Sequence, residues 1–214
     1  MSTSPGPSPL QDSRADSATA EVFRKECYRC FRAASVCICD RVPVIDNRTG
    51  VLVFQHHREL LHPIGTARIA RLGFKNVSVH VARRQQQLTI DMRPPDNCSV
   101  LYPATDAINV SRLAPEHHPS HLIVLDGTWS QAARIYRANP WLHELPHLAI
   151  DPAAPSRYRV RKQPRAGCLS TIEALVFALR IIEPGTRGFD QLLDVFESMV
   201  DDQIRFENES RSRS

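Results

Sequence analysis

The sequence predicts an α/β fold, a sheet with helices packed on it. Short apolar runs alternate with segments of helical periodicity along most of the chain, which is typical of βα units. A length of 214 residues with 42% hydrophobic composition is enough for one substantial core. We therefore expect one main domain at 43–214, preceded by a tail at 1–21 and a small cysteine-rich module at 22–42.

The tail at 1–21 is rich in Ser, Pro, Ala and Asp, a composition typical of disorder, and has no apolar run that could act as a signal or anchor. In the rest of the chain, charges or prolines interrupt each apolar run before the roughly 18 residues needed to cross a bilayer. We expect a soluble, cytoplasmic protein with no membrane partner. The pattern favours neither a monomer nor a dimer.

Four apolar runs are the clearest strands, namely 51–54, 77–81, 99–102 and 122–125. Between the first two, residues 62–72 have helical spacing, with Arg68 and Arg71 expected to face solvent. This arrangement predicts a crossover helix between two parallel strands.

The two helices expected next each begin with a capping-box pattern, Thr128 with Gln131 and Ser170 with Glu173. The helix from Ser170 to about residue 183 is apolar almost all round, which predicts burial. The last helix, from Phe189 to about residue 206, is amphipathic and should place one face on the core.

Four of the six cysteines form a compact C-x2-C-x6-C-x-C cluster, made of Cys27, Cys30, Cys37 and Cys39. Two close pairs joined by a short turn can place four thiolates tetrahedrally around one zinc ion. The alternatives are reduced thiols or two disulfides, and the second is disfavoured where no secretory signal is present. Four cysteines fill the coordination shell, so we expect a structural zinc knuckle. Cys98 and Cys168 are expected to pack in the core.

A second candidate metal site combines His56, His57, Glu59 and His62 after the first strand. The spacing is not H-E-x-x-H, and these side chains do not converge as a zinc protease requires. The preferred interpretation is that they line a cleft or cap the next helix.

Ligands of open α/β sheets bind outside the carboxyl ends of the strands. Three strand ends stand out here: Gln55-His56, Tyr102-Pro103 and the turn Asp126-Gly-Thr-Trp129. None of the eight glycines forms G-x-G, so neither a nicotinamide dinucleotide site nor the Gly-rich form of a Rossmann methyltransferase is supported.

Positive charge is concentrated at 157–165, which holds five basic residues, although the net charge is only +4. Basic residues interleaved with an aromatic ring suit contact with phosphates and bases of RNA. The candidate RNA-binding residues are Arg157, Tyr158, Arg159, Arg161, Lys162 and Gln163. The alternative is an ordinary solvated basic loop.

Together, seven motifs in this order resemble the DTW-domain family, named for its Asp-x-Thr-Trp motif. They are the cysteine cluster, Gln55-His56 with Glu59, Gly65-Thr-Ala-Arg68, Leu101-Tyr-Pro103, Asp126-Gly-Thr-Trp129, Tyr158-Arg-Val-Arg161 with Gln163-Pro164, and Ser170-Thr-Ile-Glu-Ala174. His57 departs from the family pattern, which often has proline there. The resemblance runs from about Cys27 to the C-terminal helix.

The resemblance implies a SPOUT-like sheet with flanking helices, knotted, that binds S-adenosylmethionine. It also implies transfer of the 3-amino-3-carboxypropyl group to N3 of a uridine in tRNA, with release of methylthioadenosine. Carried over by motif, the cofactor-binding residues are Leu101, Tyr102, Pro103, Asp126, Gly127, Thr128, Trp129, Leu169, Ser170, Thr171 and Glu173.

Asp126 is the carboxylate of the strongest motif, and we assign it as the candidate catalytic residue, either base or hydrogen-bond orienter. Its alternative role is to stabilise the N-terminus of the following helix. Two other functions fit the sequence: an S-adenosylmethionine-dependent RNA methyltransferase, and a zinc-binding RNA adaptor without catalysis. The adaptor would not need Asp126, Thr128 or Trp129.

Overall fold

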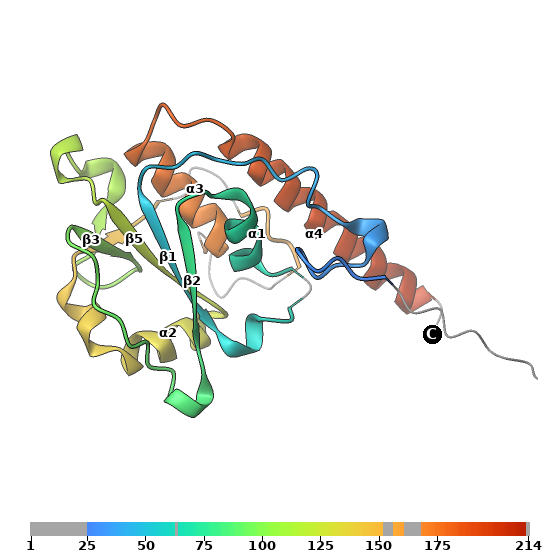
Figure 1. The fold of residues 1–214 in the computed structure, drawn as a ribbon, viewed down its shortest axis with the longest axis horizontal. Coiled ribbons are helices and arrows are strands. Elements are labelled where there is room, and N and C mark those ends of the chain that lie inside the picture. Colours follow the sequence, from blue (N-terminus) through green and yellow to red (C-terminus); the bar gives the residue numbers. More distant parts are fainter. Residues whose placement is uncertain (1–24, 63, 152–155, 161–167, 213–214) are drawn as a thin grey trace, which may run out of the picture.

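The computed structural model describes residues 25–62, 64–151, 156–160 and 168–212. These residues form one six-stranded parallel sheet with helices on both faces (Figure 1). The strands are β1 (Gly50–His56), β2 (Val77–Ala82), β3 (Cys98–Leu101), β4 (Ile108–Asn109), β5 (His121–Asp126) and β6 (His147–Ala149).

The strand order across the sheet is β2-β1-β5-β3-β6-β4, so β1 and β5 are neighbours inside the sheet and β2 forms one of its edges. β1 is paired along its length on both sides, and its Gln55 lies opposite Asp126 of β5. Since all described strands run parallel, their carboxyl ends meet at one edge. That edge is where a ligand crevice is expected.

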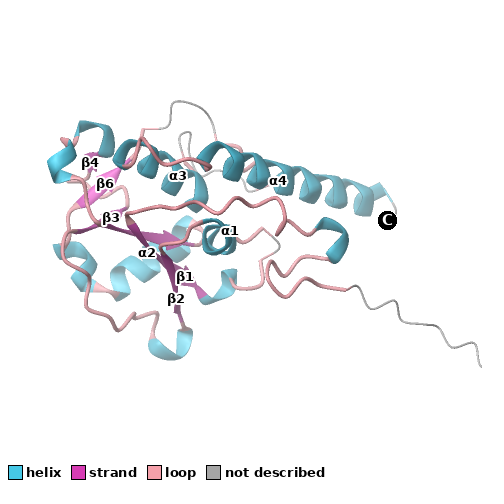
Figure 2. Ribbon diagram, turned by 45° about the horizontal axis from the view of Figure 1, so that its top comes forward, coloured by secondary structure: helices cyan, strands magenta, loops and turns pink. Residues whose placement is uncertain are grey.

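The sheet is covered by α1 (Thr66–Gly73), α2 (Trp129–Ala138), α3 (Thr171–Ile182) and α4 (Phe189–Ser212). Alternate side chains of the central strands enter two different cores, as strand geometry requires. Val53 and Val124 pack with α1, α3 and α4, whereas Phe54 and Leu125 pack with α2. α3 and α4 therefore run together along one side of the sheet (Figure 2).

The cysteine segment joins the first of these cores. Cys30 and Ile38 are buried in it, and Arg32 and Arg41 donate hydrogen bonds to Asp202 and Ser198 of α4. Within the described ranges, no helix is both long and apolar enough to cross a bilayer. The tail at 1–21 lies outside the described residues.

Most predicted elements are confirmed, with four differences. The last helix extends to Ser212 and not to about residue 206. β4 and β6 were not predicted, because strands of two and three residues leave no periodic signal. The crossover helix begins at Thr66 and not at residue 62. The prediction that Arg68 faces solvent is wrong: its side chain is buried and donates to the carbonyl oxygens of Cys30 and Leu60.

Candidate functional site

A cavity of about 370 Å³ opens at the carboxyl edge of the sheet, beside the ends of β3 and β5. Its walls are largely apolar, with a few polar groups, as is usual for sites that bind small molecules. Ten of the eleven predicted cofactor-binding residues line it: Leu101, Tyr102, Pro103, Asp126, Gly127, Thr128, Trp129, Leu169, Ser170 and Thr171. The structure thus brings together three motifs that are far apart in sequence.

Asp126, the last residue of β5, is buried at the cavity wall. Both oxygens of its carboxylate accept hydrogen bonds, one from the Gln55 amide at 3.0 Å and one from the Thr66 hydroxyl at 2.6 Å. The carboxylate is therefore held in a fixed orientation by donors from β1 and α1. This geometry suits an orienting group, and each carboxylate oxygen keeps a further lone pair for a ligand.

Two helices begin at the cavity, α2 after its N-cap Thr128 and α3 after its N-cap Ser170. Both capping boxes are formed as predicted, with the third residues Gln131 and Glu173 bonding back to the N-cap backbone. A capping box satisfies the N–H groups of the N-cap and N3 residues, and the N–H groups of the two residues between them keep no intrahelical acceptor. Two positive helix ends thus face one cavity, an arrangement that favours an anionic group of a ligand.

Glu173 was predicted to bind the cofactor, but it is not among the lining residues that the structure describes. Its carboxylate is buried and accepts hydrogen bonds from the Ser156 hydroxyl, the Arg157 N–H and the Ser170 N–H and hydroxyl, at 2.6–2.9 Å. Ser156 and Ser170 do line the cavity. Glu173 thus holds two parts of the wall together.

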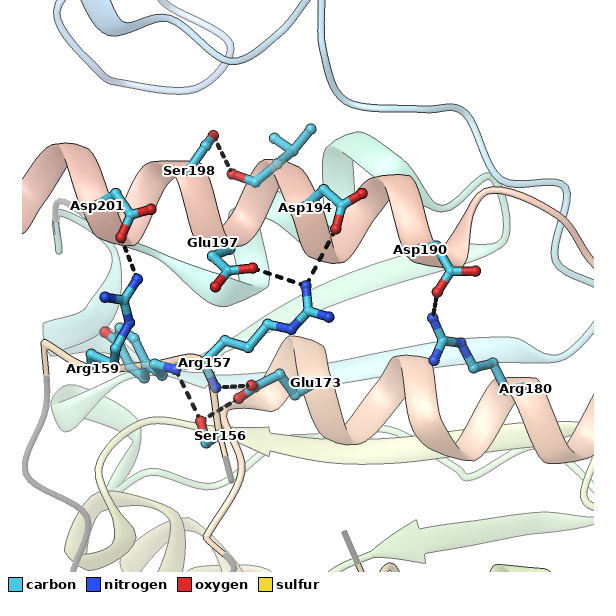
Figure 3. Close-up of polar contacts among 12 residues, drawn as sticks. Ser156, Arg157, Arg159, Glu173, Arg180, Asp190, Asp194, Glu197, Ser198 and Asp201 are labelled. Carbon is cyan, nitrogen blue, oxygen red and sulfur yellow. Dashed lines mark hydrogen bonds and ion pairs between the residues drawn. The ribbon is translucent and has the colours of Figure 1, made fainter. Parts of the chain in front are cut away.

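The arginines of the predicted RNA-binding loop that the structure describes are paired within the protein (Figure 3). Arg157 lies 3.3 Å from Asp194 and 3.0 Å from Glu197, and Arg159 pairs with Asp201, all on α4. The positive charges of these two arginines are therefore largely compensated by the three carboxylates of α4.

The remaining loop residues divide between the cavity and the part of the chain that is not described. Tyr158 is buried, packs on Phe196 and lines the cavity, so its ring is not displayed for stacking with an exposed base. Arg161, Lys162 and Gln163 lie outside the described residues.

The four clustered cysteines meet at one point, all their Sγ atoms lying within 4.8 Å of one another. The Cys27–Cys39 and Cys30–Cys37 sulfur pairs are 3.6 and 3.7 Å apart, and none is a disulfide. A tetrahedral zinc ion with bonds near 2.3 Å requires sulfur separations of about 3.8 Å. The N–H groups of Cys30 and then Arg29 lower the pKa of Cys27 to about 6, which favours its thiolate, whereas burial and then the neighbouring Cys27 raise the pKa of Cys39. The residues present fit zinc.

The histidines after β1 do not form a metal site with Glu59 in the part of the chain that the structure describes. Nδ1 of His56 accepts from the Arg58 N–H at 3.3 Å, and burial, then the neighbouring His57, lowers the pKa of His56. Cys98 packs in the core as expected, and Cys168 is also buried, at the wall of the cavity.

Sequence reasoning did not assign a site role to Ile64, Thr66 or Ser156, all of which line the cavity, whereas Glu59, which was expected to line a cleft or cap a helix, lines it too. Glu59 and Thr66 belong to the two family motifs that follow β1, so the sequence held information that could have identified them as site residues. Ser156 had none, because it belongs to a segment without periodicity whose position depends on Glu173.

A family model described as the DTW domain matches residues 24–204. A tRNA-uridine aminocarboxypropyltransferase 2 from Drosophila melanogaster is 29% identical over 75% of this chain and 67% of its own length. The mouse protein of the same name is 29% identical over 85% of this chain and 64% of its length. A tRNA-uridine aminocarboxypropyltransferase A from Arabidopsis thaliana is 26% identical over 89% of this chain and 85% of its own length. The chain spans just under two thirds of the mouse relative, and no solved structure matches it.

Proposed function

Because the chain belongs to the DTW-domain family, we propose that it transfers the 3-amino-3-carboxypropyl group of S-adenosylmethionine to N3 of a uridine in tRNA. The observation that carries the proposal is the cavity at the carboxyl edge, which the Leu101, Asp126 and Ser170 motifs line together. The names of the relatives support the same reaction. A tRNA substrate agrees with the expected cytoplasmic location.

In the proposed reaction, uridine N3 attacks the carbon that joins the aminocarboxypropyl arm to sulfur. The N–C bond forms as the C–S bond breaks, the sulfonium becomes the neutral thioether methylthioadenosine, and the N3 proton is lost. A sulfonium is already a good leaving group. The main task of the protein is therefore to align the two reacting atoms, which can supply a large part of the rate enhancement.

The cavity has complementary surfaces for the parts of this donor. Apolar walls from Leu101, Val124 and Leu169 suit the adenosine, and the N-termini of α2 and α3 suit the carboxylate of the methionine arm. The Asp126 carboxylate suits the positive ammonium or sulfonium group. Glu173 acts as a positioning residue behind this wall.

Asp126 has two possible roles in the proposal, as proton acceptor for N3 or as orienter of the donor. Its hydrogen bonds from Gln55 and Thr66 support the orienting role, because they fix the carboxylate against rotation. Trp129 begins α2 at the cavity and is 38% exposed, so its ring is available to stack on the incoming uracil.

We further infer one structural zinc ion bound by Cys27, Cys30, Cys37 and Cys39, which would stabilise the knuckle and take no part in the chemistry. Elemental analysis should give one zinc per chain, and much less after Cys27→Ser with Cys39→Ser. Substoichiometric zinc in protein purified without chelator would contradict this. A knotted, SPOUT-like arrangement remains a prediction from the family, with which the parallel sheet is compatible.

The test is incubation with unmodified tRNA and S-adenosylmethionine, followed by mass spectrometry of the nucleosides and assay of methylthioadenosine. The proposal requires a uridine carrying the aminocarboxypropyl mass. A methyl addition with S-adenosylhomocysteine as co-product would favour the methyltransferase. The adaptor would be favoured if the protein bound tRNA, gave neither product and did not bind S-adenosylmethionine.

A further inference from the structure

The carboxyl edge of the sheet, where the cavity opens, carries a second feature, a group of exposed arginines. Arg58 follows β1 and Arg83 and Arg84 follow β2, and the ends of these strands are neighbours because His56 lies opposite Ala82. Arg134 projects from α2, and its charge acts with that of Arg58 on His56. We call Arg58, Arg83, Arg84 and Arg134 the edge arginines.

The loop that carries Arg83 and Arg84 is fixed to α2 by Asn139. The Asn139 amide donates to the Leu88 carbonyl at 3.0 Å and accepts from the Ile90 N–H at 2.7 Å. In Figure 1 the segments after β1 and β2 and the helix α2 lie along the lower border of the molecule. The edge arginines are therefore presented on one side of the protein by connected elements.

These arginines differ from those of the 157–160 segment in having no acidic partner among the described residues. Within the residues that the structure describes, none of the edge arginines forms an ion pair, whereas Arg157 and Arg159 pair with α4. Charges that are not compensated locally are the ones available to phosphates. Arg58 and Arg134 lie on segments that reach the cavity, since Glu59, next to Arg58, and the first residues of α2 line it, whereas Arg83 and Arg84 follow the edge strand β2.

Resting on the proposed function, we infer that the edge arginines bind the phosphate backbone of tRNA and so bring its uridine to the cavity. The guanidinium group suits this role because it donates several hydrogen bonds in a planar fork that matches phosphate oxygens. The contacts are to the backbone, so they supply affinity and orientation, and selection of the uridine is left to the cavity.

Two double variants test the inference, Arg83→Gln with Arg84→Gln and Arg58→Gln with Arg134→Gln. The matched control is Arg112→Gln with Arg187→Gln, which removes the same charge from exposed residues on the side of α3 and α4. Binding of unmodified tRNA is measured at several salt concentrations, together with the KM for tRNA. Calorimetry with S-adenosylmethionine checks that each variant keeps the cofactor site.

Each edge variant should bind tRNA roughly tenfold more weakly or worse near 0.1 M salt, with a salt slope flatter by about 1 per lost phosphate contact. The KM for tRNA should rise far more than kcat falls, and the control should match the wild type. Edge variants with the wild-type slope and KM would overturn the inference while leaving the proposed function standing. A wild-type protein that neither binds nor modifies tRNA would overturn both.

Discussion

Gln55 and Asp126 lie opposite each other on adjacent parallel strands, and the Gln55 amide donates to the Asp126 carboxylate at 3.0 Å. Both side chains are buried at the point where β1 and β5 end. The pair therefore connects the family motif on β5 to the Gln-His motif on β1. It fixes the polar group that the proposed reaction depends on most.

Asp126→Asn should lower the rate at saturating tRNA by at least roughly tenfold while tRNA affinity stays nearly unchanged, because the lost interaction acts on the reacting groups. Gln55→Leu, which keeps the carboxylate and removes one donor, should have a smaller effect on the same rate. The exposed Asp91→Asn is the control. Single-turnover rates and tRNA dissociation constants measure both quantities, and full turnover by Asp126→Asn would refute the assigned role.

Glu173→Gln should weaken S-adenosylmethionine binding and lower the free energy of unfolding by about 1–3 kcal/mol, because an amide NH2 would face N–H donors in a buried site. Calorimetry and denaturant unfolding measure these changes. Glu197→Gln is the matched control, since this carboxylate pairs with Arg157 at the surface, where ion pairs contribute little. Equal behaviour of the two variants would show that Glu173 does not organise the cavity.

The sequence predicted what depends on local pattern. The four long strands, both capping boxes and the convergence of Leu101, Asp126 and Ser170 at strand ends could be inferred from periodicity, turn chemistry and the family motifs. It did not predict interactions between distant segments. The pairing of Arg157 with Asp194 and Glu197 of α4 is one such case, because a basic run in the sequence carries no information about its acidic partners.

Arg68 is the other such case, and it links the cysteine module to the cavity. Its guanidinium donates to the Cys30 and Leu60 carbonyls at 2.9 and 2.8 Å and lies over the Phe31 ring. Leu60 follows Glu59, which lines the cavity. Helical periodicity placed Arg68 toward solvent because the module that covers it comes from a different part of the chain.

Arg68→Leu should lower the free energy of unfolding by about 1–3 kcal/mol, since two carbonyl groups lose their donors. It should also speed the loss of the proposed zinc ion to a chelator, because Cys30 belongs to the cluster. Arg71→Leu is the control one turn away, an exposed arginine that donates to the Arg29 carbonyl at 3.2 Å. Thermal unfolding and a colorimetric zinc assay measure the two effects. If Arg68→Leu and Arg71→Leu had the same stability and the same rate of zinc loss, Arg68 would not be the residue that connects the cysteine module to the cavity.

Glu183 ends α3 and binds the segment that leads into β1. Its buried carboxylate accepts hydrogen bonds from the Arg48 N–H at 3.0 Å, the Thr49 N–H and the Thr186 hydroxyl at 2.8 Å. Burial on its own raises the pKa of Glu183, but these hydrogen bonds outweigh it and hold the pKa below the usual 4.5.

A lowered pKa in the folded state means that the ionised Glu183 stabilises the protein at neutral pH, and this contribution is lost as the pH falls below about 4.5 and through the folded-state pKa. Glu183→Gln should therefore lower the free energy of unfolding at pH 7 by about 1.5–3 kcal/mol, the usual range for hydrogen bonds to a charged group. The difference from the wild type should shrink as the pH falls below about 4.5, where the wild type protonates this group. Urea unfolding at a series of pH values measures it, with the exposed Glu209→Gln as control. A difference that stays constant across this range would show that the ionised carboxylate contributes nothing to stability.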